Sequence, residues 1–255
     1  HISSVNERVM IDSRPVSMKK LFKAASFIRR IAAQKKISLT YFEFMTAAAM
    51  RVFSAEKVDY AVVEAGLGGR YDATNLEYKK KILTVITSIA QDHTELLGKS
   101  TEKILGEKAA AAGKETIAAG AMPKPLKKKL KIMAKGSVVF ADDKYRIKSV
   151  EWRGKKLSVS LDSGCGKARV FETRMREFTQ SENIRTAVTA LDAIGIDYDK
   201  KVFEKAVLKG RFSDHKGIIL SAAHNPAAFA GLAKTLNSIY GKKRKEMIFA
   251  VLKGK

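Results

Sequence analysis

The hydrophobic pattern changes period along the chain, and each change predicts a new secondary-structure element. Stretches with apolar residues at helical spacing alternate with short runs rich in β-branched residues. The predicted helices are residues 40–56, 100–112 and 124–135, and the predicted buried strands are residues 58–65, 82–90, 116–120 and 137–141. Ser100 stands where the second helix begins and is a candidate N-cap. This order is typical of a mainly parallel sheet covered by helices.

The rest of the chain has a different pattern. Within residues 144–174 apolar and polar residues alternate in three runs separated by turn residues, which predicts an antiparallel meander. Helices are expected at 182–194 and 200–208, and "IILSAA", "PAAFAGLAKTLNSIY" and "MIFAVL" then predict strand, helix and strand. The sequence therefore predicts an α/β protein with a mainly parallel sheet, flanking helices, a small antiparallel meander and the start of a second Rossmann-like domain. The two domains are expected at residues 1–212 and 213–255.

Composition narrows the class of protein. The one cysteine, Cys165, excludes an intrachain disulfide and every zinc pattern that needs several cysteines. The formal net charge of +23 predicts either an anionic partner, such as a nucleic acid, nucleotide or polycarboxylate, or a solvated lysine surface. The lysine-rich helix lacks interleaved aromatic residues, which disfavours nucleic acid. Because no apolar run reaches the roughly 18 residues of a membrane span and no signal peptide is recognisable, we expect a cytoplasmic protein without membrane contact.

Two potential metal ligands follow neighbouring predicted strands. Glu64 stands at the end of the strand at 58–65, and His93 follows the strand at 82–90. In open α/β sheets ligands bind beyond the carboxyl ends of the strands, so this carboxylate and imidazole suit a divalent cation. The alternative is that Glu64 caps the next loop and His93 is an ordinary strand-end histidine. The glycines of "GLGGR" would let a ligand approach the backbone of that loop.

Other stretches carry groups that can bind a nucleotide. Gln180 and Asn183 in "QSENIRTA" can hydrogen-bond a base or ribose, and Arg211 in "KGRF" can clamp a phosphate. His224 lies in "AAHNP" at a predicted strand-to-helix turn, and Lys108 lies on the predicted helix at 100–112. Each of these residues has an alternative interpretation as a cap, a turn residue or a surface group.

These segments, taken in order, resemble the folylpolyglutamate synthase/dihydrofolate synthase family, a branch of the Mur ligase superfamily. The matching segments are "HISSVNERVMID", "TYFEFMTAAA", "EAGLGGRYDATN", "TSIAQDHTELLG", "GEKA", "QSENIRTAV", "GRF" and "AAHNP". The pair "GLGGRxDATN" and "DHxxxLG" is highly specific for this family. The resemblance implies that the first domain is a Mur-ligase-type ATP-binding domain and that the second is the beginning of a C-terminal glutamate-ligase domain.

The resemblance also implies roles for individual residues. It implies Mg²⁺ ligands at Glu64 and His93, and a catalytic role for His93 and for Lys108 as a carbamate. The implied nucleotide-binding residues are Asn183, Arg211, Ser221 and His224. The residues implied to face the pterin are Thr40, Tyr41, Phe42, Glu43, Tyr71, Asp72 and Ala73.

The reaction that the resemblance implies is ATP-dependent ligation of L-glutamate to a folate or to dihydropteroate. The substrate carboxylate would attack the γ-phosphate to form an acyl phosphate, and the amine of glutamate would displace phosphate. The implied cofactors are ATP and Mg²⁺, with a monovalent cation as a further candidate, and the protein is expected to be a monomer. The sequence leaves open which of the two acceptors is used.

Departures from the family pattern leave alternatives open. "LLGKST" is no phosphate loop, because the glycine required five positions before Gly98 is replaced by His93. Thr179 stands where the family has histidine, and Ser221 stands where it has aspartate. We therefore expect that the chain as given is a fragment or a decayed paralogue without ligase activity. Two further alternatives are a basic nucleic-acid-binding protein on the same scaffold and a Mur-type ligase that makes cell-wall precursors.

Overall fold

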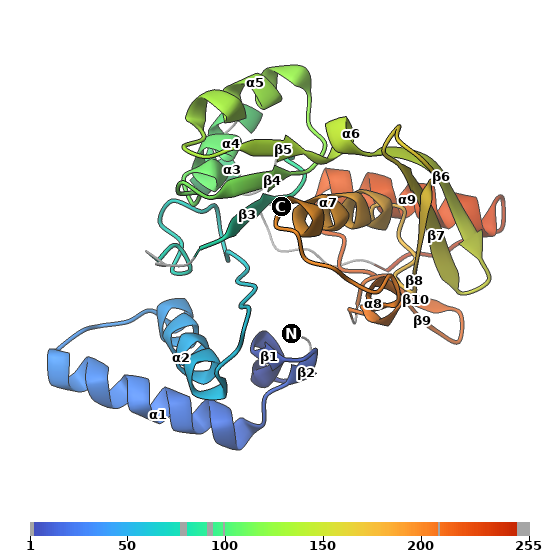
Figure 1. Cartoon of the computed structure of the whole chain (residues 1–255). Helices are drawn as coiled ribbons and strands as arrows, with labels where there is room; N and C mark the ends of the chain where they lie inside the picture. Colours follow the sequence, from blue (N-terminus) through green and yellow to red (C-terminus); the bar gives the residue numbers. More distant parts are fainter. Residues whose placement is uncertain (1–2, 77–80, 91–93, 99, 209, 249–255) are drawn as a thin grey trace. The chain divides into compact units, whose positions relative to one another are not determined.

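The structure is a computed structural model that describes residues 3–76, 81–90, 94–98, 100–208 and 210–248. The chain divides into two compact units, His1–Tyr78 and Lys79–Lys255, which are described separately below (Figure 1). No helix of the described part is long and apolar enough to cross a membrane.

The first unit is built around two helices. α1 (Met18–Lys35) begins where the Ser17 side chain accepts the backbone N–H of Lys20 at 3.3 Å, and it ends at Lys36 in the left-handed region. α2 (Tyr41–Glu56) ends in the same way at Lys57. The remaining elements of the unit are η1 (Val5–Arg8), β1 (Met10–Ile11) and β2 (Arg14–Pro15).

Apolar side chains from both helices and from the β1–β2 pair form the core of this unit. Its buried members are Val9, Val16, Leu21, Ala24, Met45, Ala48 and Val52. Full burial of one such valine or leucine contributes about 1.5–3 kcal/mol, so the helix pair has a stable base. α1 was not predicted, although Ser17 and the helical spacing of Leu21, Ala24 and Ile28 were signals for it.

The buried strand predicted at 58–65 is wrong. The segment has no regular secondary structure, and all of its residues after the half-buried Val58 are exposed, with Val62 at 95% and Tyr60 at 65% of full exposure. A strand needs a partner for its backbone N–H and C=O groups. Among the described residues of this unit, the strands β1 and β2 pair with each other and offer the segment no such partner.

The second unit contains the predicted parallel sheet. β3 (Leu83–Ile86), β4 (Thr116–Ala119) and β5 (Val138–Phe140) lie in the order β3–β4–β5, and all of them are parallel. The helices that accompany this sheet are α3 (Thr94–Leu97), α4 (Thr101–Ala109), α5 (Lys124–Met133) and α6 (Ala141–Lys144). Their shared core contains Ile86, Leu105, Ile117, Leu126, Leu130 and Phe140. Ser100 caps α4 as predicted, because its side chain accepts the N–H of Lys103 at 3.3 Å.

The predicted meander is also present. β6 (Arg146–Arg153), β7 (Lys156–Asp162) and β8 (Arg169–Thr173) are antiparallel neighbours. α7 (Gln180–Ala193) packs its apolar face on this sheet, and the shared buried core contains Leu157, Val159, Leu161, Phe171, Ile184 and Val188. α7 also approaches the parallel sheet, where a Cβ on Gly120 would lie 3.2 Å from Oγ1 of Thr186. Figure 1 shows α7 between the two sheets.

The last elements differ in part from the predicted second domain. After α8 (Lys201–Lys205), the strands β9 (Ser213–His215) and β10 (Ile218–Leu220) form an antiparallel hairpin, and α9 (Pro226–Tyr240) follows. β10 is thus the predicted strand of "IILSAA", paired with its immediate neighbour in the chain. The strand predicted in "MIFAVL" has no regular structure at residues 247–248, and its remainder lies outside the described residues. The division at residues 212 and 213 stays a prediction.

α9 is held against the residues that precede α7. The hydroxyl of Thr235, which is fully buried, accepts the backbone N–H of Phe178 at 2.9 Å. Glycine at position 231 permits this close packing, since a Cβ there would lie 2.8 Å from Cγ2 of Thr179. The end of the described chain is therefore packed on the start of α7.

Candidate functional site

The glycine-rich loop of residues 66–75 is closed by its own aspartate. The carboxylate of Asp72 accepts the backbone N–H of Leu67 at 2.8 Å, the N–H of Thr74 at 2.9 Å and the hydroxyl of Thr74 at 2.6 Å. The side-chain amide of Asn75 donates to the carbonyl of Arg70 at 3.0 Å and closes the other side. "RYDATN" is therefore a compact turn whose shape is determined by short-range hydrogen bonds.

Two positions of this loop require glycine, each for a different physical reason. A Cβ on Gly66 would lie 2.7 Å from Cζ of Phe42, so the Phe42 ring lies directly against the loop backbone. Gly68 has a φ of 67°, which other residues rarely adopt. The first glycine allows contact with α2, and the second allows the turn.

The start of α2 contacts this loop through Phe42 and is closed by a capping box. Thr40 and Glu43 form a capping box: the Glu43 carboxylate accepts the Thr40 N–H at 2.7 Å, and the Thr40 hydroxyl accepts the Glu43 N–H at 3.3 Å. Hydrogen bonds from the backbone and hydroxyl of Thr40 lower the pKa of Glu43. The predicted pterin-facing residue Glu43 thus orders the helix end.

The helix end and the loop each carry one exposed tyrosine. Tyr41 is 60% exposed, with the guanidinium of Arg8 at 5.9 Å from its ring centroid, and Tyr71 is 91% exposed. The contact between Phe42 and Gly66 brings the segment 40–43 and the loop of Tyr71, Asp72 and Ala73 to one region of the first unit. These two segments therefore lie close together, and their role in facing a substrate stays a prediction.

The predicted metal pair is described only in part. Glu64 is exposed in the irregular segment before the loop, and its carboxylate has no hydrogen bond or ion pair among the described residues. His93 lies outside the described residues. Across the described ranges no group of three or more His, Cys, Asp or Glu side chains could hold a metal ion. The chemistry of Glu64 fits Mg²⁺, which prefers oxygen ligands. The predicted convergence on His93 stays a prediction.

The predicted nucleotide-binding residues lie near the start of α7 and in the turns beside α9. Asn183 is exposed on α7 and donates from Nδ2 to Oε1 of Gln180 at 3.1 Å. The hydroxyl of Ser221 donates to the Glu177 carboxylate at 3.1 Å. His224 lies in the turn before α9 with Nδ1 at 2.8 Å from the carbonyl of Ala222.

The roles predicted for Arg211 and Lys108 stay predictions. Arg211 is exposed in the turn before β9. Lys108 is half-buried in the last turn of α4, where its charge suits the negative end of the helix dipole. Its carbamate stays a prediction.

Glu177 is a residue that the sequence analysis missed. It is 8% exposed and holds Ser221 through its carboxylate. The signal available was an acidic residue shortly before a predicted helix, where negative charge is favourable. Its partner is 44 positions away in the chain, and the hydrophobic pattern carries no trace of that pairing.

Comparison with known proteins identifies relatives over almost the whole chain. No family model matches the chain. The dihydrofolate synthase/folylpolyglutamate synthase of Buchnera aphidicola subsp. Baizongia pistaciae is 31% identical over 259 residues, which cover 99% of this chain and 58% of that protein. The protein of the same name from Escherichia coli K12 is 32% identical over 240 residues, covering 89% of this chain and 53% of that protein.

A solved structure agrees with these relatives. Mycobacterium tuberculosis folylpolyglutamate synthase, complexed with ADP and AMPPCP, matches with a TM-score of 0.82 and 27% identity over 94% of this chain and 59% of that one. The fold is therefore the α/β fold of the folylpolyglutamate synthase class, as predicted. The chain itself is a homologue of the dihydrofolate synthase/folylpolyglutamate synthases, and it spans little more than half the length of these relatives.

Proposed function

We propose that this chain is part of an ATP-dependent ligase that adds L-glutamate to a folate or to dihydropteroate. The observation that carries the proposal is the 31% identity across 99% of the chain with a protein named for both activities. The region formed by the loop at 66–75 and the start of α2 supports it, because its capped helix and closed loop present aromatic side chains beside a carboxylate.

The loop has capacity left for a ligand. A carboxylate has about four lone-pair positions for hydrogen bonds, and Asp72 uses three within the loop. One position remains for an N–H donor of a heterocycle, and Tyr41 and Tyr71 offer ring faces for stacking. In this proposal Asp72 both shapes the loop and orients the pterin.

The residues proposed to bind Mg²⁺ and the nucleotide belong to both units, with Glu64 in the first unit and Asn183 and Arg211 in the second. Glu64 would supply an oxygen ligand to Mg²⁺, and that ion would neutralise charge on the transferred phosphoryl group. Arg211 and the free N–H of the Asn183 amide would bind the nucleotide. Glu177, bonded to Ser221, would supply the carboxylate that Ser221 itself lacks.

The test is glutamate-dependent phosphate release from ATP by the gene product that contains these 255 residues. Dihydropteroate and tetrahydrofolate are offered separately, so that the acceptor with measurable turnover identifies the activity. Release should require acceptor, ATP and glutamate together. Release that continues without acceptor would contradict the ligase proposal. The monomeric state, the cytoplasmic location and the absence of nucleic-acid binding stay predictions.

Asp72→Asn should lower this release at least tenfold, because the amide replaces one acceptor oxygen by a donor. The matched control is Asp214→Asn in the β9–β10 hairpin, where the carboxylate accepts the Gly217 N–H at 3.0 Å. Equal activity of the two variants would contradict the assignment of Asp72 to the substrate site.

A further inference from the structure

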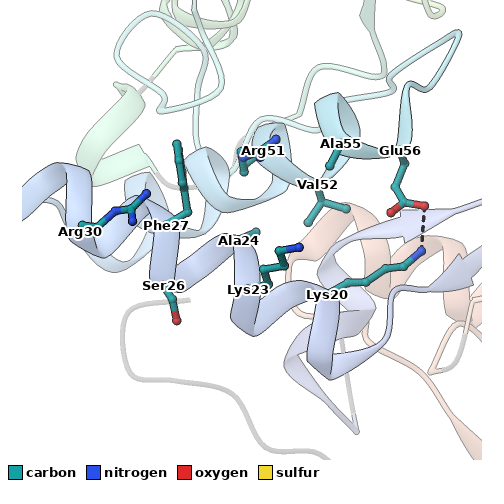
Figure 2. Close-up of a pocket in the computed structure, with 10 residues that line it drawn as sticks. All are labelled: Lys20, Lys23, Ala24, Ser26, Phe27, Arg30, Arg51, Val52, Ala55 and Glu56. Atoms are coloured by element: carbon teal, nitrogen blue, oxygen red, sulfur yellow. Dashed lines mark hydrogen bonds and ion pairs between the residues drawn. The ribbon is translucent and has the colours of Figure 1, made fainter.

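A groove with a volume of about 670 Å³ lies between α1 and α2, within the first unit (Figure 2). This volume is within the range of about 300–1,000 Å³ that is usual for small-molecule sites. Its lining combines charged and apolar side chains. The charged lining residues are Lys20, Lys23, Arg30, Arg51 and Glu56, and the apolar ones are Ala24, Phe27, Val52 and Ala55.

The positive charge of the groove is only partly balanced. Glu56 is paired with Lys20 at 2.8 Å, as the dashed line in Figure 2 shows. In the part of the chain that the structure describes, no carboxylate forms an ion pair with Lys23, Arg30 or Arg51. α1 itself carries six lysines and arginines and no acidic residue. Three cations around one cavity repel each other, and a bound anion would relieve that repulsion.

The two arginines are held in place by an aromatic ring. The guanidinium of Arg51 lies 4.9 Å from the ring centroid of Phe27, and that of Arg30 lies 5.5 Å from it. Figure 2 shows the Phe27 ring between these two side chains. Stacking occupies the face of a guanidinium and leaves the N–H donors at its edge available. Such a donor pair matches two oxygens of one phosphate or carboxylate group.

We propose that this groove binds a small polyanion with two or more phosphate or carboxylate groups, through Lys23, Arg30 and Arg51. The site is independent of the ligase proposal. Phosphate and carboxylate present equivalent oxygen pairs to a guanidinium, so the chemistry recognises either source. A nucleic-acid strand fits less well, because successive bases need several stacking rings and the groove has one, Phe27.

The test is isothermal titration calorimetry of the 255-residue chain at low salt, with tripolyphosphate in one arm and γ-linked tetraglutamate in the other. At least one probe should bind saturably with 1:1 stoichiometry, and binding should weaken as salt is added. The tighter arm identifies the source of the anion. Lys23→Gln/Arg30→Gln/Arg51→Gln should weaken binding at least tenfold, since charge-assisted hydrogen bonds are lost.

The matched control removes the same charge from α5, whose lysines do not line the groove. Lys124, Lys128 and Lys129 are exposed there, and their triple replacement by Gln should change binding less than about twofold, as expected of surface charges. If the groove variant loses its far-UV circular dichroism, the single variant Lys23→Gln carries the test with an expected loss of about threefold. Equal losses in the two triple variants would overturn the proposal. So would an absence of saturable binding, or a groove variant with unchanged affinity.

Discussion

The loop at 66–75 and helix α7 both carry predicted site residues, but they are held in different ways. The loop is closed by hydrogen bonds between residues at most five positions apart, with Asp72 at the centre. α7 is held by distant parts of the chain: Arg185 donates to the carbonyl of Tyr145 at 3.2 Å, and the N–H of Phe178, just before the helix, donates to Thr235 at 2.9 Å. Locally determined structure is readable from a short motif, whereas structure built from distant contacts is not.

The same contrast appears in burial and charge. Every residue of the loop except Gly69 is exposed or half-buried, whereas the last turn of α7 takes part in a partly buried polar network with the meander. There Arg169 donates to Asp192 at 2.8 Å and to the Tyr145 hydroxyl at 2.5 Å, and the Tyr145 hydroxyl donates to Asp192. Burial and the bond to Asp192 raise the pKa of Tyr145 to about 12. We expect the loop to change conformation when a ligand binds, and α7 to keep its conformation.

The largest effect should come from the core beneath α7. Phe171 is 1% exposed and meets Phe203 edge-on, with ring centroids 5.0 Å apart. Phe171→Ala should lower the free energy of unfolding by about 3–5 kcal/mol, because it leaves a cavity. Val170→Ala, at a neighbouring position that is 46% exposed, should cost less than about 0.5 kcal/mol. Urea denaturation of both variants measures the difference. Equal losses of unfolding free energy would show that Phe171 does not stabilise the core on which α7 packs.

A smaller effect is expected in the loop. Asp72→Asn should free the loop without unfolding the unit, at a cost of about 2 kcal/mol in local opening, because the charged acceptor of two backbone N–H groups is lost. Hydrogen exchange of the Leu67 and Thr74 amides should accelerate roughly tenfold or more. The exchange of α7 amides should not change, and acceleration there would contradict the separation of the two regions.

The cap of α2 should contribute about 1 kcal/mol. Thr40→Ala removes the acceptor of the Glu43 N–H, which typically costs about that amount, and Thr40→Ser should restore most of it. Ser100→Ala at the start of α4 is a matched change in the other unit, since Ser100 accepts the Lys103 N–H in the same way. Thermal unfolding compares them, and a Thr40→Ala cost far above that of Ser100→Ala would show that Thr40 does more than cap.

The smallest effect is the pH dependence of the network at α7. Burial alone would raise the pKa of Asp192, but hydrogen bonds from Arg169 and Tyr145 lower it overall. The carboxylate therefore stabilises the fold above its unfolded pKa of about 3.9, and this contribution is lost as the pH falls through the lower folded value. Urea titrations between pH 6 and pH 2.5 should show the wild type losing its advantage over Asp192→Asn at the acid end. A difference that stays constant would contradict the assigned charge.

Much of the fold was predictable because its determinants are local. The cap at Ser100 and the alternation within 144–174 were visible as short patterns, and the structure has both elements. The prediction of a strand at 58–65 was wrong because a β-branched run favours a strand but does not show whether a pairing strand is present. Glu177 was missed for a related reason, since its partner Ser221 lies far along the chain.

The candidate site divides in the same way. The resemblance implies that Thr40–Glu43 and Tyr71–Ala73 face the substrate, and the Phe42–Gly66 contact brings these two segments to one region, whereas their role stays a prediction. The predicted metal pair depended on a strand that does not form at 58–65, and its second member lies outside the described residues. The predicted position of Glu64 depends on strand pairing between distant parts of the chain, which no local sequence pattern predicts.

The most direct test of the account is whether the 255-residue chain binds a pterin at the loop. Dihydropteroate and tetrahydrofolate are titrated calorimetrically into the wild type, Asp72→Asn and the control Asp214→Asn. We expect saturable binding of at least one ligand, weakened at least tenfold by Asp72→Asn and unchanged by Asp214→Asn. Binding that is equally strong in all three proteins, or no binding to the wild type, would contradict the assignment of the loop and the start of α2 as the folate site.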